Sequence, residues 1–345
     1  MNGDTPFFSI LVPSYNRPDE LRRCLDSILQ SDFLGFEIIV SDDNSPRQAE
    51  VAEVVSSFES DKIRFFKQPL NLREPDNKNF LVKQAAGKFN IVLGDDDTLC
   101  KRSLHLLYEH ISRNPVSDIY GFGYNIVDEG GNLLSTYAST KTVLLNKTRS
   151  RLLVVEAGLL PMTLFHPATF CCKAGLEIDL PYRNDVGIGE DLCFLIQAVL
   201  NNHSIQIVPE ALFNWRKVQD VDSVSQGNQS AQFLASFESK RRIHGFLLSE
   251  STNEDQIHKH ISSIRFRFNF MYSELMRLDS LKPSDLSQHM DDEMIAEFLI
   301  LQKSTFWKFN YFLIRPLRFF HLCSLVGVLD AFKILWTRFF PATGP

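Results

Sequence analysis

The chain has 345 residues, of which 44% are hydrophobic, and it carries a net charge of −6. This length can bury a sizeable core, as one large or two modest domains, and the acidic balance argues against a general nucleic-acid-binding surface. The six cysteines include no Cys-x-x-Cys pair, which argues against a zinc site. No basic stretch followed by an apolar segment opens the chain, so we expect a reducing, cytoplasmic setting.

Up to about residue 120, short apolar runs alternate with amphipathic segments. The pattern predicts strands over 7–12, 36–40, 63–66 and 89–93, with helices over 18–30, 47–59 and 77–86. This β-α-β alternation is typical of a parallel sheet with helices on both faces. Ligands of such sheets bind beyond the carboxyl ends of the strands.

The pattern changes after residue 118, and we expect an α/β domain over 1–225 followed by a helical region over 226–345. Further strands are predicted over 118–127, 133–137, 163–172 and 204–208, with a helix over 192–200. The chain contains no internal repeat.

Residues 91–98 read Ile-Val-Leu-Gly-Asp-Asp-Asp-Thr, an apolar run that ends in three consecutive carboxylates. Three adjacent carboxylates repel one another, and burial strengthens the repulsion unless a cation lies among them. Such oxygen-rich sites suit Mg²⁺ or Mn²⁺, often together with substrate phosphates. The alternative is an acidic turn that caps a helix beginning near Thr98.

Two other acidic groups follow the same logic. Asp42 and Asp43 come at the end of the second predicted strand, so they belong to the same edge of the sheet as residues 95–97. Local turn chemistry is their alternative explanation. Glu190 and Asp191 follow a Gly-x-Gly sequence and precede an apolar helix, where they serve either as reactive carboxylates or as complements to the helix dipole.

Four stretches in this order resemble the inverting family 2 glycosyltransferases of the GT-A fold. They are Val-Pro-Ser-Tyr-Asn-Arg at 12–17, Ile-Ile-Val-Ser-Asp-Asp-Asn-Ser at 38–45, Leu-Gly-Asp-Asp-Asp at 93–97 and Gly-Glu-Asp at 189–191. The resemblance implies a Rossmann-like α/β fold, with a mixed, mainly parallel sheet flanked by helices. It makes residues 1–120 the nucleotide-binding half and residues 121–225 the acceptor half.

The resemblance also implies a reaction, in which a nucleotide-diphosphate sugar gives its sugar to a hydroxyl of a glycan acceptor with inversion. A divalent metal, Mn²⁺ or Mg²⁺, would stabilise the leaving diphosphate, and a carboxylate would take the hydroxyl proton. Matching the family motif places the metal on Asp96 and Asp97, and Asp95 near the ribose. Asp191 matches the general base.

The donor-binding residues implied by the resemblance surround the same edge. Asp43 matches the position that hydrogen-bonds the nucleotide base, typically uracil, so UDP is favoured, and Pro13 lies beneath that base. Tyr15 and Arg17 are further donor contacts, and Lys78 stands where the family often has an arginine. Other basic residues that could approach the phosphates are Arg73, Arg216 and Lys217.

The tail over 306–340 holds eleven aromatic residues, five Lys or Arg and a single acid, Asp330. No run reaches about 18 apolar residues, which excludes a spanning helix in this tail. Basic-aromatic helices favour the headgroup region of anionic membranes, so residues 304–340 predict peripheral membrane contact. The alternative is that the aromatics pack on the rest of the chain or on another subunit.

Together these features predict a transferase of bacterial surface-polysaccharide synthesis (O-antigen, capsule or exopolysaccharide), which acts on a lipid-linked glycan at the inner face of the cell membrane. One alternative is a sugar nucleotidyltransferase, which usually has a Gly-rich loop after the first strand. Residues 13–17 contain no glycine. A dinucleotide-binding dehydrogenase would need a Gly-x-Gly-x-x-Gly sequence after a strand, and none is present. The remaining alternative is a catalytically inactive family member that serves as a membrane-associated scaffold.

Overall fold

The computed structural model describes residues 5–113, 115–139, 142–145, 169–216 and 229–250, all within the first of two compact units, Met1–Leu286 and Ser287–Pro345. The elements follow in the order β1 (Phe8–Ser14), α1 (Pro18–Leu29), β2 (Phe36–Asp42), α2 (Gln48–Ser56), β3 (Ile63–Lys67), α3 (Glu74–Gln84), β4 (Phe89–Val92), β5 (Thr98–Leu99), α4 (Ser103–Arg113), β6 (Ile119–Val127), β7 (Leu133–Tyr137), β8 (Val143–Leu145), β9 (Phe170–Lys173), α7 (Leu176–Asp179), α8 (Glu190–Leu200), β10 (Ile205–Arg216) and α9 (Gln229–Glu250).

The strands form one mixed sheet in the order β3-β2-β1-β4-β9-β6-β10-β5, with β7 beside β6 and β8 beside β10. Strands β3, β2, β1 and β4 are all parallel, and β6 and β10 are parallel to each other. Strand β9 is antiparallel to both β4 and β6, and so joins the two parallel groups. The predicted mixed α/β sheet flanked by helices is therefore confirmed.

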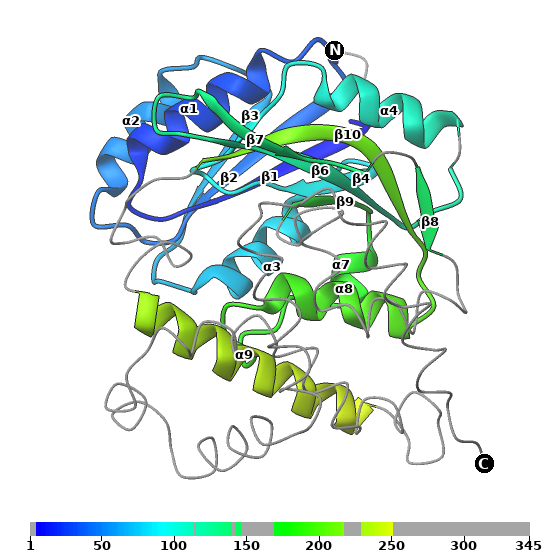
Figure 1. Cartoon of the computed structure of the whole chain (residues 1–345). Coiled ribbons are helices and arrows are strands. Elements are labelled where there is room, and N and C mark those ends of the chain that lie inside the picture. The colour runs from blue at the N-terminus through cyan, green and yellow to red at the C-terminus, as the bar shows by residue number, and fades with distance from the viewer. Residues whose placement is uncertain (1–4, 114, 140–141, 146–168, 217–228, 251–345) are drawn as a thin grey trace, which may run out of the picture. The chain divides into compact units, whose positions relative to one another are not determined.

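Helices cover both faces of this sheet. Figure 1 shows α1, α2 and α4 on one face, and α3, α7 and α8 on the other. The apolar side of α1 explains its position, since Leu21, Leu25 and Ile28 are completely buried in the core. Each such side chain contributes roughly 1.5–3 kcal/mol relative to an exposed position. Pro18 begins this helix, where its missing N–H is not needed.

The central strand β1 sets the geometry of the carboxyl edge. Its register pairs Ser14 with Asp42 at the end of β2 on one side, and Leu11 with Val92 at the end of β4 on the other. The start of β4 is held close to β1 at Gly87. A Cβ built on Gly87 would lie 2.6 Å from the backbone nitrogen of Ser9, so only glycine permits this approach.

Strand β8 and helix α7 were not predicted from the sequence, and two further elements differ from the prediction. No helix begins near Thr98: Thr98–Leu99 is the short strand β5, and the next helix, α4, begins at Ser103. Strand β10 does not end at Val208 but continues to Arg216, with register shifts between Val208 and Ala211 and between Ala211 and Phe213. These shifts let the strand pass Pro209, a residue that otherwise ends a strand.

Among the described residues, no helix has the length and apolarity needed to cross a bilayer. The basic-aromatic tail over 304–340 lies outside the described residues, as do Lys217 and residues 163–168 of one predicted strand. Cys171 and Cys172 are both free and completely buried on β9.

Candidate functional site

The two aspartates at the end of β2 have different surroundings. Asp42 is completely buried and accepts hydrogen bonds from the Ser45 backbone N–H at 3.1 Å, the Ser45 hydroxyl and Gln48 Nε2 at 3.0 Å. It therefore forms the turn that leads into α2. Asp43 instead accepts the Leu72 backbone N–H at 2.7 Å, and burial raises its pKa. Only Asp43 keeps a carboxylate oxygen outside the turn.

The loop after β1 lies beside these aspartates. Pro13 pairs with Ser41 in the sheet, and Tyr15, with 47% of its surface exposed, donates its backbone N–H to Asp95 Oδ2 at 3.3 Å. Asn16 adopts a positive φ of 62° and donates its N–H to Ser45 Oγ at 2.7 Å. The loop thus connects the ends of β2 and β4, and leaves the side chain of Tyr15 exposed.

The three aspartates after β4 differ in exposure. Asp95 and Asp97 are buried, whereas the side chain of Asp96 is 24% exposed. Arg17 bridges two of them, with Nη1 3.3 Å from Asp95 Oδ1 and 2.9 Å from Asp96 Oδ2. Asp97 accepts the backbone N–H of Arg216 at 3.2 Å. Asp96 is therefore the member of this cluster with the most open carboxylate.

Electrostatics of the cluster fit a hard cation. Burial and the neighbouring Asp96 raise the pKa of Asp95 to about 7, although Arg17 opposes this, and the same two causes raise the pKa of Asp97. Three carboxylates in so small a volume are destabilised when ionised, and a divalent ion with oxygen preference would offset that cost. Within the described ranges, no three acidic, histidine or cysteine side chains already form a metal-binding arrangement. The donor set fits, but its ligand geometry is not formed.

Asp191 lies in a separate ionic cluster built from α3 and α8. Lys78 Nζ is 3.0 and 3.1 Å from the two oxygens of Asp191 and 2.7 Å from Glu190 Oε1. Glu74, one turn earlier on α3, places Oε1 2.9 Å from the same nitrogen. Burial raises the pKa of Asp191 to about 8, against the opposing effect of Lys78. Asp191 is thus a protonatable carboxyl near neutral pH.

The two clusters are electrostatically connected. Lys78 lowers the pKa of Glu74, and Arg17, which bridges Asp95 and Asp96, adds to this lowering. Arg17 thus contacts the strand-end aspartates and also acts electrostatically on Glu74, which links the two clusters.

The loop that precedes Asp191 is held by α9. Gly187 has a φ of +76°, and a Cβ built on Gly189 would lie 2.5 Å from Ser239 Oγ. Arg183 places its guanidinium 4.1 Å from the centre of the Phe246 ring, a cation–π contact. Glycine is therefore required at position 187 by the backbone conformation and at position 189 by close packing on the helix.

Of the other basic residues, Arg73 precedes α3 with a positive φ of 70°. Its backbone N–H donates a hydrogen bond to Asn71 Oδ1. The guanidinium of Arg216 lies 3.1 Å from Glu20 Oε1. Lys78, a proposed donor contact, has only 3% of its side chain exposed and faces carboxylates. The structure thus brings Pro13, Tyr15, Arg17, Asp43 and Asp95–Asp97 together at one edge, and joins Lys78 to Asp191.

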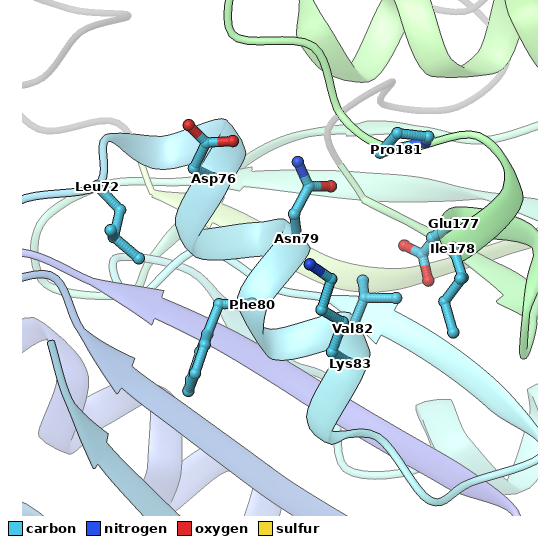
Figure 2. A pocket seen from close by; sticks show the side chains of 9 residues that line it. All are labelled: Leu72, Asp76, Asn79, Phe80, Val82, Lys83, Glu177, Ile178 and Pro181. Carbon is cyan, nitrogen blue, oxygen red and sulfur yellow. The ribbon is translucent and has the colours of Figure 1, made fainter.

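A cavity of about 380 Å³ lies on another side of α3 (Figure 2). Its lining combines Leu72, Phe80, Ile178 and Pro181 with polar side chains of Asp76, Asn79, Lys83 and Glu177. None of the strand-end aspartates contributes to it, and neither does Asp191. The cavity therefore borders the site through Leu72 and Glu177 but does not include its aspartates.

Sequence reasoning did not identify Glu74 or the buried support beneath Asp191. Tyr182 donates its hydroxyl to Glu177 at 2.7 Å, and its ring centre lies 5.5 Å from Lys78 Nζ. Glu74 and Lys78 have the i,i+4 spacing of a helical ion pair, a signal that the sequence did contain. The contact of Tyr182 with Lys78 joins residues more than one hundred positions apart and had no local signal.

Comparison with known proteins identifies the family and the fold. The family model described as glycosyl transferase family 2 matches residues 9–174. A β-1,3-glucosyltransferase of Campylobacter jejuni that is named for GalNAc(5)-diNAcBac-PP-undecaprenol is 32% identical over 134 residues, 39% of this chain and 42% of its own length. The Escherichia coli enzyme WfgD, named UDP-Glc:α-D-GlcNAc-diphosphoundecaprenol β-1,3-glucosyltransferase, is 25% identical over 173 residues, 48% and 65% of the two lengths.

Among solved structures, residues 1–349 of S. aureus TarS in complex with UDP-GlcNAc are 20% identical, with a TM-score of 0.58 over 85% of this chain and 79% of that one. This likeness supports the GT-A fold. The alignments span less than two thirds of the two curated relatives' length, at 42% and 65%. Family match and fold agree on the part that carries β1 to β9, and residues 9–174 are therefore a glycosyl transferase family 2 domain.

Proposed function

We propose that this protein transfers a sugar from a nucleotide-diphosphate sugar, with UDP favoured, to a hydroxyl of a lipid-linked glycan, with inversion at the anomeric carbon. The observation that carries the proposal is the placement of Asp43 and Asp95–Asp97 after β2 and β4, the two strands that flank β1, together with the effect of Arg17 on Glu74 in the Lys78–Asp191 cluster. The acceptor class follows the names of the two curated relatives. Because the lipid of such an acceptor stays in the bilayer, we expect the reaction at the cytoplasmic face of the membrane, in surface-polysaccharide synthesis.

In the proposed donor site, Asp43 accepts a hydrogen bond from the base, while Pro13 and Tyr15 flank it. Asp95 contacts the ribose, and Arg17 turns from the aspartates toward the diphosphate. Asp96 and Asp97 would hold Mn²⁺ or Mg²⁺, which supplies positive charge to the leaving diphosphate when bound.

In the proposed reaction, the acceptor oxygen forms a bond to the anomeric carbon as the bond from that carbon to the diphosphate oxygen breaks. The bonding electron pair leaves with the diphosphate, and the hydroxyl proton passes to a carboxylate oxygen of Asp191. Asp191 suits this role because burial holds its pKa near 8, so the ionised form is a stronger base than an exposed aspartate.

A thermal-shift screen tests the donor site first. UDP, GDP, dTDP and CDP are each added with Mn²⁺, Mg²⁺ or EDTA, to the wild type and to Asp96→Asn. We expect stabilisation by UDP that requires metal and is lost in Asp96→Asn, but is retained in the exposed control Asp61→Asn. No shift with any pair would contradict the donor site and favour the scaffold alternative.

Transfer itself is tested with UDP-glucose and UDP-GlcNAc against a GlcNAc-diphosphate-lipid acceptor. Asp191→Asn should abolish transfer while the dissociation constant of UDP stays within about twofold, because the base contacts the acceptor rather than the nucleotide. Full transfer activity in that variant would overturn the role of Asp191.

A further inference from the structure

Lys78 occupies an unusual position for a donor contact. Its side chain is 3% exposed, and its ammonium lies within 3.1 Å of oxygens from three carboxylates: Glu74, Glu190 and Asp191. An ammonium has three N–H donors, and here all three directions are occupied by carboxylates. The ammonium of Lys78 thus contacts the cluster that contains Asp191, the proposed base.

The contact with Asp191 involves both carboxylate oxygens, at 3.0 and 3.1 Å. A single hydrogen bond would leave the carboxyl group free to rotate about its last bond, whereas two contacts to one nitrogen restrict that rotation. The nearly equal distances mean that Lys78 fixes the plane of the carboxylate. A base must present its oxygen to the acceptor hydroxyl within about 3 Å, so this restriction bears directly on proton transfer.

Charge in the cluster is unbalanced. One ammonium faces three carboxylates, and Tyr182 adds its ring 5.5 Å away. Burial disfavours ionisation of Asp191, Lys78 favours it, and Glu190 and Glu74 disfavour it further. Lys78 itself remains charged, because the three carboxylates raise its pKa despite burial. Lys78 therefore lowers the pKa of Asp191, whereas the two glutamates raise it.

We propose that Lys78 is a positioning residue, whose ammonium holds the carboxylate of Asp191 toward the acceptor and keeps it available to accept a proton. This inference rests on the proposed function of Asp191 as the base. It differs from the donor contact that the family resemblance implies for Lys78, because a donor contact would act on nucleotide affinity. The two roles separate in kinetics, since one changes KM for the donor and the other changes kcat and its pH dependence.

The test compares Lys78→Met, Lys78→Arg and Glu74→Gln with Lys83→Met, an exposed control on the same helix. Values of kcat and of the donor KM are measured from pH 6 to 9.5 with UDP-glucose or UDP-GlcNAc and the lipid-linked acceptor, and UDP affinity is measured separately. For Lys78→Met, we expect the acid limb of the kcat profile to move up by at least about one pH unit. That shift is a loss of about tenfold or more at pH 7, with UDP affinity within about twofold of the wild type.

Glu74→Gln should shift the acid limb of the kcat profile in the opposite direction. Its side chain is 55% exposed, so the variant keeps the core intact, and removing one carboxylate should move the acid limb to lower pH. Lys78→Arg keeps the positive charge and should retain the wild-type position of the acid limb, with a reduced kcat because the guanidinium fork has a different shape. These two variants carry the test if Lys78→Met does not fold.

The inference is overturned if Lys78→Met changes only the donor KM or keeps the kcat profile of the wild type. If Lys78→Met does not fold, the same result in both Lys78→Arg and Glu74→Gln overturns the inference. It is also overturned if Lys78→Met and Glu74→Gln move the acid limb in the same direction. Failure of the proposed function looks different, because the wild type would then transfer no sugar, or Asp191→Asn would remain fully active.

Discussion

Replacing Asp191 by asparagine should make the fold more stable than the wild type, by a difference that grows as the pH rises. Burial raises the pKa of this carboxyl to about 8 in the folded chain, against an ordinary value of 3.8. Between these two pH values the folded state binds more protons than the unfolded state, so the carboxyl progressively destabilises the wild type as pH increases. Asparagine has nearly the same shape and does not titrate, so the variant escapes this penalty.

The magnitude follows from proton binding. From pH 5 to pH 7 the folded state holds close to one extra proton at this site, so the stability gap between variant and wild type should widen by up to about 2.7 kcal/mol. For a unit of this size, about 1 kcal/mol corresponds to roughly 2–4 °C in Tm, which gives a widening of roughly 5–10 °C. Buried acids that do not interact with Asp191, such as Asp95, are present in both proteins and cancel in the difference.

The assay is thermal unfolding followed by circular dichroism, for the wild type and Asp191→Asn at pH 5, 6 and 7. The exposed control Asp61→Asn should keep a constant Tm difference from the wild type over the same range. Equal Tm differences at pH 5 and pH 7 for Asp191→Asn would refute the reasoning, since they would mean that Asp191 is ionised at no cost in the folded chain.

Three further predictions concern backbone spacing and the two aspartates at the end of β2. Gly87→Ala should destabilise the fold by about 1–3 kcal/mol in urea unfolding, because its Cβ would lie 2.6 Å from a backbone nitrogen; an unchanged midpoint would contradict that contact. Gly189→Ala should lower the transfer rate by displacing the loop before the base, whereas Gly245→Ala, with open space around it on α9, should stabilise by about 0.5–1 kcal/mol without changing the rate. Asp42→Ala should cost about 1–3 kcal/mol of stability and leave UDP affinity unchanged, while Asp43→Ala should weaken UDP binding in calorimetry; the reverse result would exchange their roles.

The sequence predicted the first half of the sheet well because its signals are local. Apolar runs of strand length and the 3.6-residue periodicity gave β1 to β4 and α1 to α3 to within a few residues. Strand β10 was predicted only to Val208, since Pro209 normally ends a strand and the register shifts that accommodate it depend on pairing with β6. The sequence did not predict α4, and the helix start expected near Thr98 is instead the short strand β5.

For the site, sequence reasoning located the acidic groups but not their partners. Asp42 and Asp43 are equivalent in the sequence, and only the long-range contact of Asp43 with Leu72 separates them. Lys78 was assigned to the donor by resemblance, whereas its ion pair with Asp191 joins residues 113 positions apart. Such contacts depend on how α3 and α8 pack, and no local pattern encodes that packing. The individual residue roles remain predictions.

The central place of β1 has a consequence for how substrate range can change. Strands β2 and β4 flank it, so the two groups of donor-side aspartates are separated by two strand spacings, about 10 Å, which main-chain hydrogen bonds maintain. Asp191 instead reaches the site through side chains of α3 and α8. Under the proposed function, substitutions in those helices and their loops would adapt the protein to a differently shaped acceptor, while the spacing of the proposed nucleotide contacts, which the main chain of the sheet sets, would stay constant.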